Sequence, residues 1–507
     1  MKNNHQGSIL IAVMVFGVVF IISFSAIASL VITGHRLIQQ KTAREKAFQI
    51  AEAGLNYYRW QLAHNLEDFD GVSNVPYYDP SGDLIGYYSV TAEPIEYVAT
   101  GSTVTLCHKP ETAAERTLTV ADDALPAHLA HGDYEGECGG DASINFSTIA
   151  ITATGWTPEY PNSIRIVKAL YGRPSLAKYA YVSNSNIWFG SSENITGTVH
   201  ANGGIRMDGT CNSLITSTQE TYICGSEHGC SDEEKPGIWG SSSRSDLWDF
   251  PIANGVDFDA ITVDLENIKT LATAEGVYLP PSGAYGYLIT FSDSGSIDVR
   301  KVTKLQSAVL GHNGTDWVTE AHSYKNTSNV GTYEIPDNGL IFVEDDVWVE
   351  GVVDGRATLA AARLPDGSYT DASIFIQNNI EYDLRDGSSV LGLIAQKDIL
   401  IPLYAPNELI IDAALLAQKG HVFRYYYPSS MYSQAIRSSI ETYGTIITNT
   451  VWTFSWVSSA DGPVISGYQN TSSVYDPYLL YGPPPSFPSG DEYEFISWEE
   501  ILPNEEG

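Results

Sequence analysis

The chain has 507 residues, and its 61 Asp and Glu outnumber its 27 Lys and Arg, so its formal net charge is −34. This charge argues against nucleic acid as a partner and against docking on an anionic membrane surface, because both need clustered cations. Only 17% of the residues are charged, whereas there are 31 Tyr and 44 Gly, a composition that favours a β-rich extracellular protein over a charge-rich cytosolic helical one.

The N-terminus carries a long apolar segment. Residues 8–33 contain no charged side chain, and their length exceeds the roughly 20 residues that cross the hydrocarbon core as a helix. Beyond them, apolar side chains recur at steps of three and four residues: Phe48, Ala51, Leu55, Tyr58 and Leu62. We therefore expect one continuous helix over residues 8–64, whose first half suits lipid or a helical bundle and whose second half suits a globular head.

This N-terminus resembles that of a type IV prepilin, with a polar leader over residues 1–7 that ends in Gly7, followed by Ser8 and an apolar helix. Residues 44–54, Arg-Glu-Lys-Ala-Phe-Gln-Ile-Ala-Glu-Ala-Gly, are similar to the segment that follows the membrane helix in PilX-type minor pilins. The resemblance implies that prepilin peptidase cleaves between Gly7 and Ser8, and that the helix binds other pilins and the pilus assembly machinery. Major pilins carry Glu at the fifth mature position, where this chain has Ala12. Several minor pilins also lack it, so the resemblance favours a tip or priming subunit.

A plain signal anchor is the alternative interpretation of the same segment. The cations after the span outnumber Lys2 before it, which by itself favours a cytoplasmic C-terminus. The acidic, Tyr-rich remainder favours export instead. We therefore predict a single-pass protein of the cell membrane with an extracellular or periplasmic C-terminal domain, and a place in a pilus.

After the helix, three segments alternate apolar and polar residues as half-buried strands do: 86–97, 143–154 and 163–171. Together with the helix they predict a small α+β head over residues 65–180, as in pilins. An insertion over residues 99–142 separates the first two strands.

A nine-residue pattern of apolar positions around a polar turn recurs from Ile187 onward. Its copies begin at Val199, Ile341, Ile374, Leu393 and Leu415. The pattern predicts stacked coils of a parallel β-helix, with amides such as Asn202 and Gln396 in ladders at the turns. A β-sandwich of ordinary hairpins is the competing interpretation.

The predicted fold class is therefore mainly β with a long N-terminal α-helix: a pilin-like stalk and small head, then an interrupted parallel β-helix. The first coils are expected over residues 181–209, an inserted subdomain over 210–330, and further coils with a C-terminal cap over 331–507. Residues 339–500 resemble an uncharacterised domain of bacterial pilus-assembly proteins that has no known activity.

The insertion contains five candidate metal ligands: Cys107, His108, His128, His131 and Cys138. Thiolate and imidazole are the ligands that zinc prefers, so these residues fit a structural zinc site. They fit equally a Cys107–Cys138 disulfide with solvated histidines, which an oxidising exterior permits. The spacing matches no known zinc finger.

A second cysteine cluster contains Cys211, Cys224 and Cys230. A disulfide between Cys224 and Cys230 is the default expectation, with Cys211 free or joining the pair at a metal.

No catalytic motif stands where a strand and a helix would support it. The acidic runs 232–234 and 344–346 are expected to be solvated turns. The aromatic residues Trp348, Tyr382 and 425–427 suit either sugar stacking or core packing. The predicted function is therefore a non-enzymatic minor pilin-like subunit of a type IV pilus or pseudopilus. The alternative is a membrane-anchored polysaccharide-binding protein or enzyme with a β-helix domain.

Overall fold

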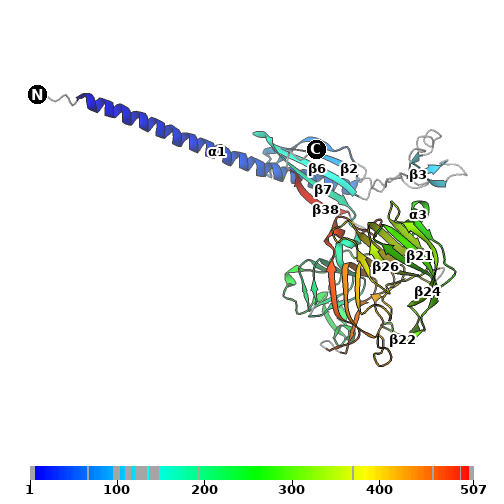
Figure 1. The fold of residues 1–507 in the computed structure, drawn as a ribbon. Helices are drawn as coiled ribbons and strands as arrows, with labels where there is room; N and C mark the ends of the chain where they lie inside the picture. The colour runs from blue at the N-terminus through cyan, green and yellow to red at the C-terminus, as the bar shows by residue number, and fades with distance from the viewer. Residues whose placement is uncertain are drawn as a thin grey trace. The chain divides into compact units, whose positions relative to one another are not determined.

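The computed structural model describes residues 6–65, 68–94, 103–108, 116–121, 134–135, 148–191, 193–367, 370–458, 462–490 and 493–501; side-chain positions are described for these except residues 6–10, 12, 94, 103–148 and 262–263. The chain divides into two compact units (Figure 1). The head unit comprises Met1–Tyr97, Val104–Gly172 and Tyr493–Gly507. The solenoid unit comprises Val98–Thr103 and Arg173–Glu492.

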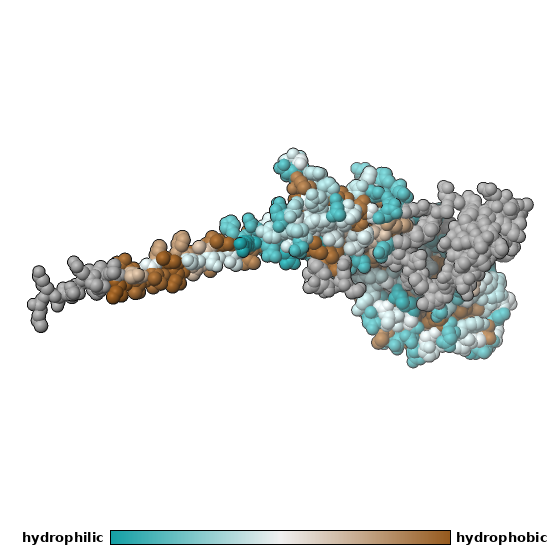
Figure 2. All heavy atoms as spheres, turned by 90° about the horizontal axis from the view of Figure 1, so that it is seen from above, coloured by the Kyte–Doolittle hydropathy of each residue, from teal (hydrophilic) through white to brown (hydrophobic). Residues whose placement is uncertain are grey.

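A single helix, α1 (Gln6–His64), runs through the apolar segment and into the head unit, which confirms the predicted continuous helix (Figure 1). The described apolar side chains of its first half point outward, and they colour much of the stalk brown in Figure 2. In the second half the predicted stripe turns inward, where Leu55, Tyr58 and Leu62 are buried and Phe48 is half-buried. One helix therefore has two different environments along its length.

The second half of α1 packs on an antiparallel sheet of five strands: β1 (Val72–Tyr78), β2 (Leu84–Pro94), β6 (Thr148–Thr157), β7 (Tyr160–Gly172) and β38 (Glu494–Ile501). Alternate residues of β6, such as Ile149, Ile151 and Ala153, join the core beneath the helix. Gly155 permits the closest approach, because a Cβ there would lie 2.2 Å from the carbonyl oxygen of Ala47. The head is therefore one helix on one sheet.

The C-terminal strand belongs to the head unit, which corrects the predicted C-terminal cap for this strand, whereas Leu479 and Phe487 before it pack on the ladder as part of the solenoid unit. β38 pairs antiparallel with β7, so that Trp498 lies opposite Ala169. Its aromatic side chains pack against α1: the rings of Phe48 and Trp498 meet edge to face at 5.8 Å, and the Arg59 guanidinium lies 5.3 Å from the Phe495 ring centre. The unsatisfied edge of β7 and this aromatic contact explain the pairing.

The solenoid unit is built on a ladder of ten parallel strands. In spatial order these are β18 (Trp248–Asp249), β14 (Ile215–Ser217), β11 (Thr198–Ala201), β8 (Tyr179–Ser183), β34 (Ile436–Thr448), β32 (Glu408–Ala417), β30 (Val390–Ala395), β27 (Arg356–Ala361), β25 (Leu340–Val343) and β19 (Val277–Leu279). This confirms the predicted long helix followed by a mainly β region with stacked parallel strands.

Two further rows of strands complete each coil. One row contains β20 (Tyr287–Ser292), β26 (Val347–Val353), β28 (Ile374–Phe375), β31 (Ile399–Leu400), β33 (Val422–Phe423) and β35 (Trp452–Thr453), with β9 (Ile187–Phe189), β12 (Ile205–Met207) and β17 (Ile238–Trp239) in a separate sheet. The other contains the end of β26, β29 (Ile380–Tyr382), β32, β34 and β37 (Val464–Tyr475), with β10 (Asn194–Ile195) and β13 (Thr210–Cys211) as a separate pair.

Both faces of the ladder are covered. Ile341, Leu393 and Leu415 belong to the core inside the coils, whereas their neighbours Phe342 and Ile394 belong to a second core that includes the helix α3 (Ile261–Glu275). This is why ladder strands such as β25 and β30 are continuous apolar runs and do not alternate.

The chain enters this ladder in its middle. β8 pairs with β34, more than 250 residues later, and the chain then winds away to β18 before it resumes at the opposite end with β19. The head unit accordingly ends at Gly172 rather than near residue 180. Residues 210–330 were expected to form an inserted subdomain, but most of their apolar strands are coils in register with the others, because Ile215 and Val277 occupy ladder positions.

Three antiparallel pairs are added to the coils by that segment: β15 (Thr221–Cys224) with β16 (Glu233–Pro236), β21 (Ser296–Leu305) with β24 (Tyr324–Glu334), and β22 (Val309–His312) with β23 (Trp317–Glu320). β21 also pairs antiparallel with β20, and its Ile297 and Val299 join the core inside the coils. A further short strand, β36 (Ser455–Val457), pairs with β37. The 3₁₀ turns are η2 (Leu176–Lys178), η3 (Ser226–His228), η4 (Ser245–Leu247) and η5 (Pro477–Leu480).

The predicted repeat matches the ladder in four of its five copies. Leu393 pairs with Leu415, and Ile341 and Val199 occupy the equivalent position through intermediate strands. The copy at Ile374 is misplaced, because Ile374 pairs with Ile399 in another row and Leu359 takes the ladder position. A short amide ladder does form at the turns around Asn202, whose amide donates to Asn184 at 2.6 Å, while the Asn184 amide donates to Asn449 at 3.0 Å. Gln396 was also expected in a ladder, but its side-chain oxygen accepts from the backbone NH groups of Arg363 and Ala372 instead.

Candidate assembly surface and disulfide site

The first half of α1 carries a long run of exposed apolar side chains. Ile11, Phe16, Phe20 and Leu30 are each more than 60% exposed. By length and composition this helix suffices to cross a membrane, and none of its apolar window is buried. Each such side chain gains about 1.5–3 kcal/mol on leaving water, so burial of this surface would be favourable.

The predicted cleavage position lies at the start of this helix. Gly7 and Ser8 both belong to the first turn of α1, and the orientation of their side chains is not described. Cleavage between them stays a prediction of the sequence.

The Cys/His insertion contributes three short strands: β3 (Thr103–His108), β4 (Arg116–Ala121) and β5 (Tyr134–Glu135). Cys107 and His108 lie in β3, where Cys107 stands opposite Tyr134 of β5. Their side chains, and all of His128, His131 and Cys138, lie outside the described residues. Zinc and disulfide therefore both stay predictions. In the described part of the chain, no three His, Cys, Asp or Glu side chains converge as a metal site would require.

The structure joins Cys224 to Cys230, with 5.5 Å between their Cα atoms. The bond closes the β15–β16 hairpin around η3. Cys211 is a buried free thiol whose Sγ lies 3.4 Å from the carbonyl oxygen of Ser213. Burial raises the pKa of the Cys211 thiol, so this sulfur stays protonated and apart from the pair.

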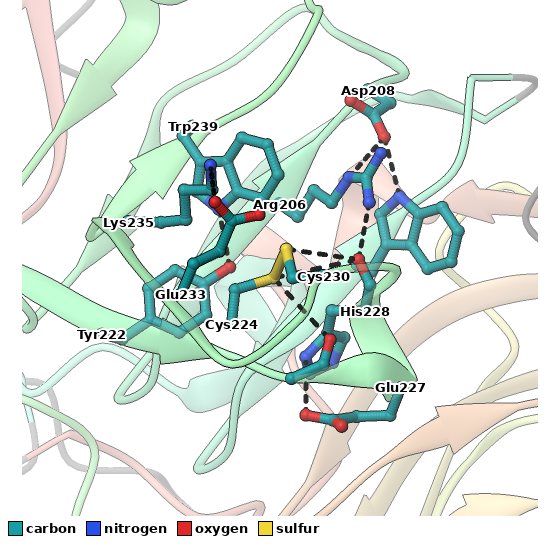
Figure 3. Close-up of a disulfide and its surroundings, with 12 residues drawn as sticks. Arg206, Asp208, Tyr222, Cys224, Glu227, His228, Cys230, Glu233, Lys235 and Trp239 are labelled. Carbon is teal, nitrogen blue, oxygen red and sulfur yellow. Dashed lines mark hydrogen bonds and ion pairs between the residues drawn. A yellow bond between two sulfur atoms is a disulfide. The ribbon is translucent and has the colours of Figure 1, made fainter.

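A column of stacked side chains holds the disulfide loop against the coils (Figure 3). The Arg206 guanidinium lies between two indoles, 4.6 Å from the Trp188 ring centre and 5.0 Å from that of Trp239. It donates to the Asp208 carboxylate at 2.7 Å and to the carbonyl oxygen of His228, within the loop, at 2.6 Å. The guanidinium itself fills the space between the two rings, so the column fastens the loop and offers no open aromatic cage.

Sequence reasoning did not single out this column, although a signal was present. The three residues follow Ile187, Ile205 and Ile238, which pair with one another on successive coils. Trp, Arg and Trp therefore hold the same position in three coils, and aligning the coils by those isoleucines would have found them.

One predicted solvated turn is instead buried, which corrects the interpretation of residues 344–346. The Asp345 carboxylate accepts hydrogen bonds from the backbone NH and hydroxyl of Ser282, at 2.8 and 2.6 Å, and from Arg363 at 2.6 Å. Burial alone would raise the pKa of Asp345, but these bonds and the Arg363 cation hold it below its usual value. Sequence periodicity does not show that a turn will be enclosed by neighbouring turns.

The aromatic residues considered for sugar stacking belong mostly to the core. Trp348, Tyr382 and Tyr427 are buried, and only Tyr425 and Tyr426 are partly accessible. The carboxylates at the coil turns face cations: Asp371 lies 3.2 Å from Lys419, which also pairs with Asp366. The ion pairs of Lys419 with Asp366 and Asp371 therefore fit a structural role for these carboxylates.

No family model matches the chain, and no curated protein matches it. Among solved structures, it is similar to the competence-associated pilin ComZ from Thermus thermophilus. The similarity has 13% sequence identity and a TM-score of 0.27, and it covers 91% of this chain and 98% of that chain. A TM-score of this size does not establish a shared fold.

Proposed function

We propose that this protein is a minor pilin-like subunit of a type IV pilus or pseudopilus, anchored by α1 and exposing the solenoid unit. The observation that carries this proposal is the division within one helix. Its first half presents exposed apolar side chains all around, and its second half forms the core of the head. A simple membrane anchor does not need its helix to continue unbroken into the head. A subunit whose helix moves from the bilayer into a helical bundle does gain from it, because the unbroken helix connects the bundle rigidly to the head.

In this proposal the helix passes from the bilayer into a bundle of like helices, which replaces lipid contacts by helix–helix contacts of similar energy. Prepilin peptidase removes the leader before Ser8, and the C-terminal part is extracellular or periplasmic. The role is assembly rather than catalysis. Most of the chain follows His64, and a body of that bulk suits a tip or priming position better than a closely repeated one.

The alternative, an anchored polysaccharide-binding protein or enzyme, has no specific observation in its favour. The aromatic side chains that would stack on sugars are mostly buried, and the coil-turn acids just described face cations.

The N-terminus of the mature chain tests the proposal. Mass spectrometry of the protein from the membrane fraction should find a chain that begins at methylated Ser8. Gly7→Trp should block this shortening, because the peptidase site would have to accept a bulky side chain. Gly17→Trp is the matched control, since nothing lies within 4 Å of the position where its Cβ would stand. Normal shortening of the Gly7→Trp variant would overturn the proposal.

A further inference from the structure

The stalk carries the opposite charge from the rest of the molecule. The first 65 residues contain six Lys and Arg but only two Glu, within a chain whose formal net charge is −34. Four of these cations follow the apolar run within eleven residues: Arg36, Lys41, Arg44 and Lys46. We call this group the basic collar. The acidic composition of the whole chain therefore conceals one locally basic segment.

All four side chains of the basic collar are exposed, and none forms an ion pair within the part of the chain that the structure describes. At about 100° per residue, their positions spread around α1 and do not gather on one side. Figure 2 shows hydrophilic atoms at this level, between the brown part of the stalk and the head. Cations that encircle a helix suit a partner that surrounds it.

The position of the basic collar along α1 is defined by the end of the apolar run and by the start of the contact with the head sheet. The apolar run ends at Thr33, and α1 first becomes buried against the head at Ala43. At about 1.5 Å per residue, Arg36 lies about 5 Å and Lys41 about 12 Å beyond the apolar run, whereas Arg44 and Lys46 lie about 17 and 20 Å beyond it, farther than the headgroups extend. The headgroup layer on each side of a bilayer is about 5–8 Å thick, and long Lys and Arg side chains extend several ångströms along the helix axis.

The apolar run by itself does not determine how deeply α1 inserts into the bilayer. Its 26 residues span about 39 Å, whereas the hydrocarbon core is about 30 Å thick. The helix is therefore free to slide by about six residues unless another interaction selects a position. Cations at the phosphate level would select the position in which Thr33 lies at the surface nearest the head, leaving the Gly7–Ser8 bond outside the hydrocarbon on the other side.

We propose that Arg36 and Lys41, the two cations of the basic collar next to the apolar run, bind anionic phospholipid headgroups in the leaflet nearest the head, and so set the depth of the stalk. The proposal rests on the membrane anchorage proposed above. Charge complementarity carries it, together with the continuity of the collar with the apolar run. An anionic surface contributes about 1 kcal/mol for each nearby Lys or Arg, about a fivefold preference per cation.

The test measures which lipids the full-length protein retains. The chain is reconstituted in bilayers with equal amounts of phosphatidylglycerol and phosphatidylcholine, extracted in mild detergent, and its bound lipids are quantified by mass spectrometry. The wild type should retain phosphatidylglycerol preferentially, and Arg36→Gln with Lys41→Gln should lower this preference about tenfold or more. The control variant, Lys304→Gln with Lys325→Gln, removes the same charge from exposed positions of the solenoid unit and should behave as the wild type.

Equal phosphatidylglycerol retention by the wild type and the collar variant would overturn the inference. It would also be overturned if the collar variant lost filament incorporation with unchanged lipid retention, because the cations would then bind a neighbouring subunit. If the wild type were absent from the membrane fraction, the proposed function itself would fail, which separates the two failures.

Discussion

The head unit and the solenoid unit differ in where they put charge. In the head, one helix covers one sheet, and the ion pair between Arg165 and Glu500 stays partly accessible at the sheet edge. In the solenoid, turn stacks on turn, and charged groups become enclosed. Arg424 has no exposed surface, and its guanidinium donates to the carbonyl oxygens of Leu403 and Gln434 at 3.2 and 2.9 Å, besides that of Pro402.

The difference shows that charged side chains of the solenoid unit are buried because its coils stack on one another, and not because of its amino-acid composition. A helix on a sheet leaves its outer surfaces open to water, so charge stays there at little cost. Stacked turns exclude water from one another, so each enclosed charge needs a partner of good geometry. The solenoid should therefore respond more strongly than the head to the loss of one ionic partner.

The largest expected effect follows from removing an enclosed cation. Arg363→Met leaves the Asp345 carboxylate buried without its counterion and should lower the free energy of unfolding of the solenoid unit by about 3–5 kcal/mol, measured by urea denaturation. Arg244→Met, which breaks an exposed ion pair with Asp246, should cause no measurable change.

The pH dependence of that variant sharpens the comparison. Because the folded pKa of Asp345 lies below its usual value, its stabilising contribution is present above about pH 4 and is lost as the pH falls through the folded pKa. Without Arg363 the carboxyl can be protonated more readily, so the deficit of the variant should shrink as the pH is lowered towards 4. A deficit independent of pH would assign the effect of Arg363 to packing.

A second, somewhat smaller effect compares two leucines of the same helix. Leu55 is 1% exposed in the head core, whereas Leu30 is 75% exposed on the stalk. Leu55→Ala should lower the unfolding free energy of the head unit by about 2–5 kcal/mol, and Leu30→Ala by less than about 0.5 kcal/mol, in detergent-solubilised protein followed by denaturation. Similar losses for the two variants would contradict the division of α1 into an exposed half and a core half.

The smallest effect concerns the disulfide loop. Cys224 and Cys230 are six positions apart, so replacing both by Ser should lower stability by about 2 kcal/mol, and the Arg206 contacts should keep the loop docked. Thermal unfolding of the solenoid unit measures this. Dithiothreitol should shift the wild type to the same extent and leave the double variant unchanged.

Local patterns in the sequence predicted the parts of the fold that depend on neighbouring residues. The helix and its apolar stripe followed from steps of three and four residues, and the coil register at Val199, Leu393 and Leu415 followed from a shared pattern of apolar positions. At the candidate sites, the cysteine spacing was enough to favour the Cys224–Cys230 pair. Each of these features can be recognised from a short stretch of the chain.

Only the tertiary structure decided which distant segments meet. Nothing local in Tyr179–Ser183 shows that it pairs with β34, or in Glu494–Ile501 that it returns to the head sheet. The column around Arg206 and the burial of Asp345 likewise arise only when coils are stacked. The physical reason is that periodicity records which face of a segment is apolar, whereas the choice of partner depends on edges and surfaces brought together from hundreds of residues away.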